Sequence, residues 1–294
     1  MRHLMSPLDF FPWKSWSSFW ILLLILKRIP RNMHMPVQEK KLATLFYEPS
    51  TRTRLSHEAA MLNLGGSIMG FSSADSSSAA KKVKVYLTQS VPFPVTLTIC
   101  AMRHPKEGAP MVACQHSSIP VINAGDGGHQ HPTQTLTDLM TIRSLKGHLD
   151  NMTNWSVRRL EIRPYRTFPY SRSCSLSGHP ILVLISPEEL RLPGYIRHDV
   201  LDKNEVPYEE VVRLEDALPK LDLLYMTRVQ KERFFNEEDY VRMKDFYILD
   251  AAKMKLAPED MYVLHPLPRV NEISTEVDKD PRAAYFKQMQ YGVY

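Results

Sequence analysis

The stretch LATLFYEPSTRTRLSHEAAMLNLGG, which spans Leu42–Gly66, decides the fold class of this chain. Its short apolar start predicts a buried strand. A helix is expected to follow directly, with its first turn near Ser50–Thr53 and its end at Gly65-Gly66. The expected apolar face of that helix consists of Leu55, Ala59, Leu62 and Leu64. A buried strand that runs straight into a helix is typical of α/β folds with parallel sheets.

The beginning of the expected helix contains groups that bind an anion. Ser50, Thr51, Arg52 and Thr53 supply hydroxyls and a guanidinium where free backbone N–H groups converge, which suits a phosphate. For this motif alone, an ordinary helix N-cap with solvated arginines is the alternative interpretation. The small, flexible run FSSADSSSAAK (Phe71–Lys81) suits either a loop that closes over an anionic ligand or a plain surface loop.

Four later segments place polar groups or prolines after an apolar, strand-like run. AMRHPKEG brings Arg103 to the end of one strand, and PVINAGDGGHQHPTQ brings His131 and Gln134 to the first turn of a helix. DLLYMTRVQKERF (Asp222–Phe234) and YVLHPLPRVNEI (Tyr262–Ile273) are likewise apolar, strand-like runs that end in polar residues or prolines. Ligands collect at the carboxyl ends of parallel strands, so these ends are the expected binding region. A lone histidine at such a position would more often be structural.

In this order and spacing, STRTR, MRHP, NAGDG with HPTQ, TRVQKER and HPLPR resemble the aspartate/ornithine carbamoyltransferase family. STRTR and HPTQ are shared across that family, whereas TRVQ and HPLPR favour its aspartate-specific catalytic chains. Ornithine enzymes typically carry a cysteine where this chain has Pro266. The resemblance implies direct transfer of a carbamoyl group from carbamoyl phosphate to the amine of L-aspartate, a step of pyrimidine synthesis. No cofactor, metal ion or covalent enzyme intermediate is implied.

The resemblance also implies roles for residues at matching positions. The phosphate would be held by Ser50, Thr51, Arg52 and Thr53. The carbonyl oxygen would be polarised by Thr53, Arg103 and His131, because positioning and charge stabilisation are the protein's expected contribution. The carbamoyl nitrogen would be oriented by Gln134 and by the backbone carbonyls of Pro266 and Leu267. The aspartate carboxylates would be bound by Arg228 and Gln230.

The resemblance further implies an assembly and a domain organisation. Ser77 and Lys81 correspond to groups that the family donates from a neighbouring subunit, so a homotrimer with shared active sites is expected. The sequence leaves open whether regulatory chains join such trimers. Two doubly wound, mainly parallel α/β domains are expected, with the active site between them. A carbamoyl phosphate-binding domain would cover residues 1–150 and an aspartate-binding domain residues 151–294, with the family's last long helix missing.

Three stretches, residues 11–38, 82–98 and 154–179, do not fit this pattern. The first contains an apolar run that is too short to span a bilayer, and no small-residue cleavage site follows it as in a signal peptide. The second alternates like a strand but carries two prolines. The third has neither a helical nor a strand period. The family has an acidic helix, a second helix and a G-D-L-K-x-G-R-T turn at these places.

The same three stretches dominate the charge of the chain. The 294 residues carry a net charge of +5, and the three stretches together hold +10, so the remainder carries −5. The stretches also contain all four tryptophans. The positive net charge of the whole chain therefore gives no support for a nucleic-acid partner. The apolar run gives no support for a membrane protein. Three cysteines without paired spacing fit a reducing cytoplasm.

We hypothesise that the three stretches are out-of-frame translations, because regrouping permitted codons restores family-like sequence in each of them. Genuine divergence is the alternative. An arginine that the family uses to bind aspartate would be coded across Pro164 and Tyr165 and is absent. The chain as printed is therefore expected to fold poorly and to have little activity. Two alternative functions stay open: a carbamoyltransferase for another amino acid, and a non-catalytic or damaged paralogue that retains the carbamoyl phosphate half-site.

Overall fold

The computed structural model describes residues 3–5, 37–76, 97–149, 152–157, 181–188, 191–192, 194, 197–227 and 247–293. The chain divides into two compact units, which are Met1–Leu136 with Gly292–Tyr294 (unit 1) and Thr137–Tyr291 (unit 2). The division falls inside helix α6 (Pro132–Lys146), whereas the sequence places the domain boundary just after that helix, near residue 150. The difference concerns only the unit to which α6 is assigned.

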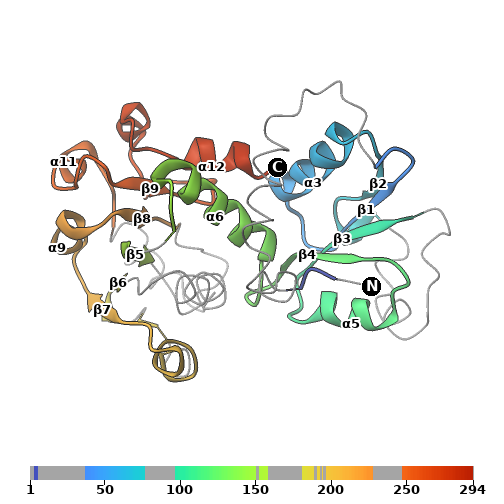
Figure 1. Ribbon diagram of the computed structural model, residues 1–294, viewed down its shortest axis with the longest axis horizontal. Coiled ribbons are helices and arrows are strands. Elements are labelled where there is room, and N and C mark those ends of the chain that lie inside the picture. Colours follow the sequence, from blue (N-terminus) through green and yellow to red (C-terminus); the bar gives the residue numbers. More distant parts are fainter. Residues whose placement is uncertain are drawn as a thin grey trace. The chain divides into compact units, whose positions relative to one another are not determined.

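Unit 1 is built on a four-stranded parallel sheet (Figure 1). Its strands, in spatial order, are β2 (Ser67–Phe71), β1 (Lys41–Phe46), β3 (Ile99–His104) and β4 (Val121–Asp126). Phe46 of β1 lies opposite Arg103, and His104 lies opposite Asp126. The carboxyl ends of β1, β3 and β4 therefore share one edge of the sheet. This is the edge that the sequence predicted as the binding region.

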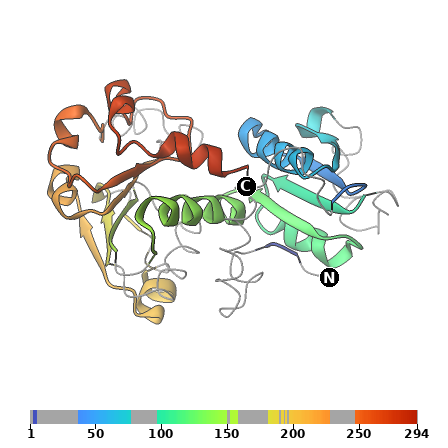
Figure 2. The same cartoon turned by 45° about the horizontal axis from the view of Figure 1, so that its top comes forward.

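The described helical segments of unit 1 are α3 (Thr51–Asn63), the short η2 (Ala74–Ser76), α5 (Ala109–His116) and the first turn of α6. Figure 2 shows α3 and α5 on opposite faces of the sheet. Leu42 and Phe46 of β1 pack in one cluster with Met61 of α3. Ala43 packs in a second cluster with Ala109 of α5. Successive residues of a strand point to opposite faces, so β1 supplies both halves of the core.

The expected beginning and end of α3 are confirmed, but its expected apolar face is wrong. Leu55 and Leu62 are more than half exposed, at 56% and 54%. The buried face instead includes Glu58, whose Oε1 accepts hydrogen bonds from Thr44 Oγ1 at 2.9 Å and from Arg54 Nε at 2.7 Å. A buried carboxylate is tolerated when donors of this kind satisfy it. Apolar periodicity alone could not reveal such a partner.

Unit 2 is built on a five-stranded parallel sheet. Its strands, in spatial order, are β7 (Tyr208–Val211), β6 (Ile181–Ile185), β5 (Thr153–Val157), β8 (Leu223–Tyr225) and β9 (Tyr262–Leu264). After α6, its described helical segments are η5 (Arg197–Leu201), η6 (Asp202–Asn204), α9 (Leu214–Ala217), η7 (Leu218–Lys220), α11 (Ala251–Met254), η9 (Thr275–Lys279) and α12 (Tyr285–Tyr291). The expected class of two α/β units with parallel sheets is confirmed.

Two elements of unit 2 differ from the sequence-based expectation. The pattern of PYEEVVRLEDALPKLDLLYM predicts a helix followed by a strand, but its Tyr208–Val211 forms the edge strand β7 and pairs with β6. The unusual stretch 154–179 shows neither a helical nor a strand period, but its start lies in the central strand β5, between β6 and β8. In both cases hydrogen bonding to a neighbouring strand decides the conformation, and the local pattern does not reveal that neighbour.

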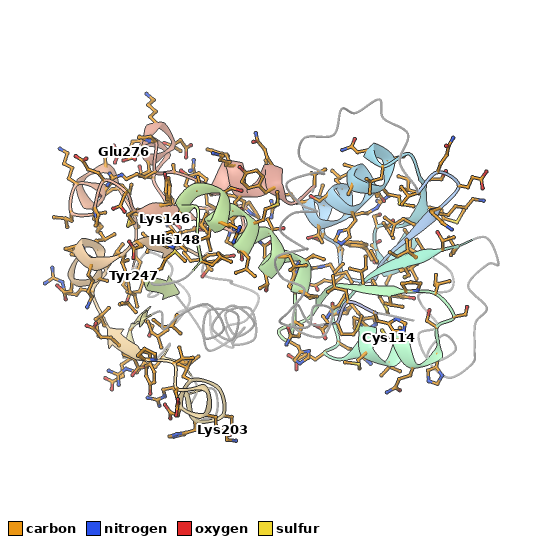
Figure 3. All side chains as sticks on the ribbon, viewed as in Figure 1. Cys114, Lys146, His148, Lys203, Tyr247 and Glu276 are labelled. Carbon is orange, nitrogen blue, oxygen red and sulfur yellow. The ribbon has the colours of Figure 1, made fainter. Side chains whose placement is uncertain are left out.

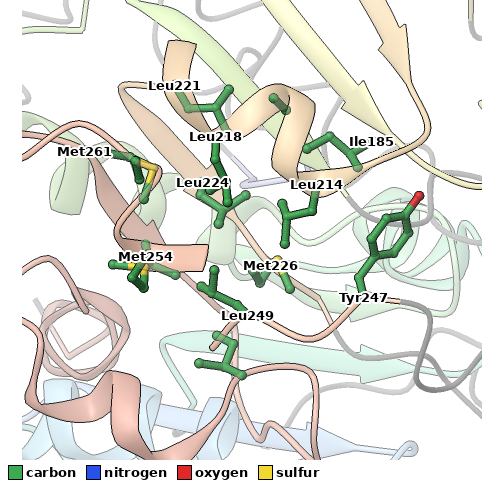
Figure 4. Packing of buried hydrophobic residues seen from close by; sticks show 14 of the residues in the cluster. Ile185, Leu214, Leu218, Leu221, Leu224, Met226, Tyr247, Leu249, Met254 and Met261 are labelled. Carbon is green, nitrogen blue, oxygen red and sulfur yellow. The ribbon is translucent and has the colours of Figure 1, made fainter. Parts of the chain in front are cut away.

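The core of unit 2 lies among β6, α9, η7, β8 and α11. Figure 4 shows Leu214, Leu218 and Leu224 packed together, with Met226 and Leu249 beside them. Burial of each such side chain contributes about 1.5–3 kcal/mol. This core holds β8 and β9 in place. The segments that follow these two strands contain predicted binding residues, so the core fixes where those segments begin.

The far end of α6 is anchored within unit 2. Figure 3 labels Lys146 near that end. Its Nζ lies 2.9 Å from Asp260 Oδ2 and 5.6 Å from the centre of the Tyr262 ring. A cation in the last turn is also stabilised by the helix dipole. Among the described helices, none combines the length and the hydropathy needed to cross a bilayer.

Candidate active site

The first turn of α3 brings the four predicted phosphate-binding residues together. Ser50 precedes the helix in an extended conformation, and its Oγ donates a hydrogen bond to Thr53 Oγ1 at 3.1 Å. Thr51 and Arg52 are exposed, and this first turn contains no acidic residue. An α-helix leaves its first N–H groups without intrahelical acceptors, at the positive end of its dipole. This turn therefore has both the charge and the donors to bind a phosphate.

Arg103 lies at the adjacent end of β3 and is buried, with 7% of its surface exposed. Its Nη1 donates to the backbone carbonyl of Ala124 at 3.2 Å. A Cβ atom at residue 125 would lie only 2.5 Å from Nη1, so any other residue there would force the guanidinium to shift. Gly125 also has φ +117°, which favours glycine for backbone reasons. The NAGDG motif thus makes room for the guanidinium.

His131 reaches the same glycine from the beginning of α6. A Cβ atom on Gly125 would lie 3.3 Å from His131 Cδ2, so the imidazole and the guanidinium of Arg103 both approach residue 125. The Nδ1 atom of His131 accepts the backbone N–H of Gln134 at 3.4 Å, which leaves Nε2 as the protonated nitrogen. Gln134 lies in the first turn of α6, as predicted. The structure therefore brings Arg103 and His131 together as two buried donors.

The charge of Arg103 is balanced by a residue that the sequence did not single out. Glu48 Oε2 lies 3.2 Å from Arg103 Nη2, and Glu48 comes three residues before Thr51, the first residue of α3. Burial lowers the pKa of the neighbouring His104, whose Nδ1 accepts the N–H of Lys106 at 2.9 Å. His104 is therefore neutral at neutral pH and adds no positive charge here. A bound dianion would compete with Glu48 for the guanidinium.

Asp126 organises the turn between β4 and α6, although the sequence analysis assigned it no role. It is 2% exposed. Its Oδ2 accepts from Gly108 N and pairs with His129 Nδ1, both at 2.9 Å. Its Oδ1 accepts from Gln130 N at 2.7 Å and from Asn123 Nδ2 at 3.2 Å. The only sequence signal was an acid inside a glycine-rich turn, which is also common at turns of no special function.

In unit 2, the predicted residues Pro266 and Leu267 form the turn after β9, and Leu267 has φ +50°. The N–H of His265 donates to Gln288 Oε1 at 2.9 Å, and that of Leu267 donates to His265 Nδ1 at 2.8 Å. Pro266 has no N–H group. The backbone N–H groups of His265 and Leu267 are therefore both engaged within the protein. Toward a ligand this segment presents carbonyl oxygens, which accept hydrogen bonds, and this suits an NH₂ group.

The other four predicted site residues, Ser77, Lys81, Arg228 and Gln230, lie outside the described residues. Within the described part of the chain, no group of three or more His, Cys, Asp or Glu side chains is arranged to hold a metal ion.

The chain matches two family models over most of its length. Residues 2–144 match the aspartate/ornithine carbamoyltransferase carbamoyl-P binding domain, and residues 176–294 match the Asp/Orn binding domain of the same family. An aspartate carbamoyltransferase catalytic subunit from Lachnoclostridium phytofermentans is 61% identical over 298 aligned residues, covering 100% of this chain and 95% of the relative. A catalytic subunit from Clostridium botulinum is 55% identical, with 100% and 94% coverage.

Two solved structures agree with these matches. The catalytic subunit of M. jannaschii aspartate transcarbamoylase is 37% identical, with a TM-score of 0.82 over 100% of this chain and 94% of that one. Aspartate transcarbamoylase from Trypanosoma cruzi, in complex with N-(phosphonacetyl)-L-aspartic acid, is 32% identical, with a TM-score of 0.84 and coverage of 99% and 92%. These matches confirm the resemblance seen in the sequence motifs. The chain belongs to the aspartate/ornithine carbamoyltransferase family.

Proposed function

We propose that this chain transfers the carbamoyl group of carbamoyl phosphate to the amine of L-aspartate, giving N-carbamoyl-L-aspartate and phosphate for pyrimidine synthesis. The observation that carries the proposal is the approach of buried Arg103 and His131 to Gly125, at the sheet edge that also holds the first turn of α3. An anion site beside two buried donors suits a phosphate attached to a carbonyl group. The names of the relatives support aspartate as the acceptor.

In the proposed reaction, the residues of unit 1 bind and polarise carbamoyl phosphate. Ser50, Thr51, Arg52 and Thr53 hold the phosphate, and Thr53, Arg103 and His131 donate to the carbonyl oxygen. The aspartate amine attacks the carbonyl carbon, so a C–N bond forms while the C–O bond to phosphate breaks. Negative charge develops on the carbonyl oxygen during this step. Buried donors that are already in place stabilise this charge without having to reorganise.

The remaining assignments concern orientation of the two substrates. Gln134 and the backbone carbonyls of Pro266 and Leu267 would orient the carbamoyl nitrogen. The acceptor-only backbone of the turn after β9 supports this role. Arg228 and Gln230 would bind the aspartate carboxylates. This assignment stays a prediction from the resemblance of the TRVQ motif. The place of the active site between the two domains also stays a prediction, from the family resemblance as a whole.

The proposed function is tested by offering carbamoyl phosphate with different acceptors. For the chain with its reading frame restored, we expect carbamoyl transfer to L-aspartate and none to L-ornithine, measured as the carbamoylated amino acid and as released phosphate. Transfer to ornithine would show that the chain is a carbamoyltransferase for another amino acid. If resequencing confirms the printed chain as a single clean frame, binding of carbamoyl phosphate without transfer to any acceptor would support the non-catalytic alternative.

The assay has to be combined with resequencing of the gene, because of the three unusual stretches. We expect compensating insertions and deletions at the edges of residues 11–38, 82–98 and 154–179. The printed chain is expected to bind carbamoyl phosphate with little aspartate turnover, whereas a chain with the frame restored is expected to be active. Full activity and good solubility of the printed chain would contradict the frame hypothesis, since that chain lacks the expected aspartate-binding arginine.

We also infer a homotrimer with shared active sites, to which Ser77 and Lys81 contribute from a neighbouring subunit. Leu55 and Leu62 support a subunit contact, because they lie two turns apart on the outer face of α3 and are more than half exposed. A biosynthetic enzyme with these substrates and with free thiols at Cys100 and Cys114 fits the cytoplasm. Whether regulatory chains join the assembly stays open.

The trimer gives a separate prediction. Replacing both Leu55 and Leu62 by glutamate places charge on the exposed face, and we expect the trimer to dissociate into monomers. Analytical ultracentrifugation of the wild-type chain and the double variant measures this directly. Glutamate at Val270, which is 67% exposed in unit 2, is the matched control and should leave the mass unchanged. A wild-type monomer, or a double variant that stays trimeric, would contradict the assignment of this face.

A further inference from the structure

The turn Pro266–Arg269 lies between two buried side chains that have no role in the proposed reaction. His265 precedes the turn and Glu272 follows it, and each is 1% exposed. The Nε2 atom of His265 lies 2.8 Å from Oε1 of Glu272. The pair therefore joins the two ends of the turn inside unit 2.

The hydrogen bonds of His265 fix its tautomer. Its Nδ1 accepts the backbone N–H of Leu267 at 2.8 Å. A neutral imidazole has one donor and one acceptor, so the ring proton lies on Nε2 and is donated to Glu272. A second proton on Nδ1 would face the N–H of Leu267 and break that bond. The imidazole is thus held neutral and sets the position of the Leu267 backbone.

Glu272 holds the other end of the turn through its second oxygen. Oε2 accepts the backbone N–H of Val270 at 3.0 Å and that of Asn271 at 3.2 Å. Burial acts to raise the pKa of Glu272, but hydrogen bonds from His265 and from the backbone outweigh it, so the pKa lies below its ordinary value. The residue is therefore a carboxylate with three donors, and each donor fixes part of the turn.

The pair is itself connected to the core of unit 2. The N–H of His265 donates to Gln288 Oε1, and Gln288 Nε2 donates to Asp138 Oδ1 at 2.6 Å. Asp138 Oδ2 accepts from Tyr225 OH at 3.1 Å. Buried networks in which every member has partners are rigid. The turn is thus tied to α12, α6 and β8.

We propose that His265 and Glu272 are positioning residues that fix the backbone carbonyls of Pro266 and Leu267 for the carbamoyl nitrogen. The proposal rests on the proposed function, in which these carbonyls accept hydrogen bonds from that nitrogen. Neither side chain of the pair touches substrate. Their effect reaches the ligand through the Leu267 N–H on one side of the turn and through the Val270 and Asn271 N–H groups on the other.

Two stable ligands separate the role of the turn from that of the phosphate site. Methylphosphonate carries only the phosphate-like group. Phosphonoacetamide carries the same group and an amide that resembles the carbamoyl group, with a methylene in place of the bridging oxygen. The ratio of their dissociation constants, measured by titration calorimetry, reports the amide contacts alone. The wild-type chain is expected to bind phosphonoacetamide at least about tenfold more tightly.

Three variants test the pair. Glu272→Gln keeps the size of the side chain but replaces one acceptor oxygen by an NH₂ donor. That NH₂ group would face either the N–H groups of Val270 and Asn271 or the ring N–H of His265, and the hydrogen bonds there would be lost. We expect it to reduce the affinity ratio about tenfold and to leave methylphosphonate binding unchanged. Asparagine at 265 imitates the Nδ1 side of histidine, whereas glutamine imitates the Nε2 side. His265→Asn should therefore retain more of the ratio than His265→Gln, which loses the acceptor for Leu267.

The control is Val183→Ala, which truncates a fully buried side chain of β6 in the core of the same unit. It should lower the melting temperature without changing the affinity ratio. A wild-type ratio above ten that Glu272→Gln and His265→Gln both retain would overturn the positioning role and leave the proposed function intact. A wild-type ratio of one would refute the proposed contact of the turn with the amide, and the positioning proposal with it.

Discussion

Replacement of Gly125 by alanine is expected to weaken binding of phosphonoacetamide about a hundredfold or more. The added Cβ would lie 2.5 Å from Arg103 Nη1 and 3.3 Å from His131 Cδ2, so both donors have to move. The backbone at φ +117° also disfavours a side chain. Titration calorimetry of the purified variant measures the loss. The effect is large because one substitution displaces both of the buried donors proposed to contact the carbonyl oxygen.

Gly65→Ala is the matched control for this prediction. Gly65 has φ +85°, so alanine there meets a similar backbone penalty, but no heavy atom lies within 4 Å of the added Cβ. Gly65→Ala should lower the melting temperature and leave ligand binding unchanged. Equal losses of binding in the two variants would mean that backbone strain, and not displacement of Arg103 and His131, explains the result.

Replacement of Asp126 by asparagine is expected to destabilise unit 1 by about 3 kcal/mol. Both carboxylate oxygens accept two hydrogen bonds each in a site that is 2% exposed. An amide NH₂ in place of either oxygen would face a backbone N–H, which is Gly108 on one side and Gln130 on the other. Urea unfolding followed by the fluorescence of the chain measures the change.

The same substitution should also weaken phosphonoacetamide binding, because Asp126 holds the turn that leads to His131. Asp199→Asn is the control, since Asp199 is exposed and its ion-pair partner among the described residues is Lys203, four residues along the chain in η6. It should change stability by less than about 0.5 kcal/mol. If Asp126→Asn were as mild as Asp199→Asn, the carboxylate would not be the organising group of the turn.

Much of the fold of unit 1, and of its proposed carbamoyl phosphate site, could be predicted from the sequence, because the sequence patterns there act over only a few residues. The apolar run before Ser50, the hydroxyls and arginine at the helix start, and Pro132 after His131 act through their immediate neighbours. The structure accordingly places Arg103, His131 and Gln134 at the expected ends of strands and helices.

The residues that the sequence analysis missed depend on partners far along the chain. Glu48 is explained only by Arg103, and Glu58 only by Thr44 and its own helical neighbour. His265 and Glu272 are close in sequence, but their role depends on burial, which a polar segment does not reveal. The strand β7 was missed for a related reason, because its conformation is set by pairing with β6.

The sheet of unit 1 separates two packing clusters, and this separation has an evolutionary consequence. Met61 of α3 shares a cluster with Leu42 and Phe46, whereas Ala109 of α5 shares one with Ala43. A change of volume on one helix can therefore be compensated only by strand residues that point toward that helix. Among related chains, positions on α3 should co-vary with alternate positions of β1, and α5 should diverge independently of α3.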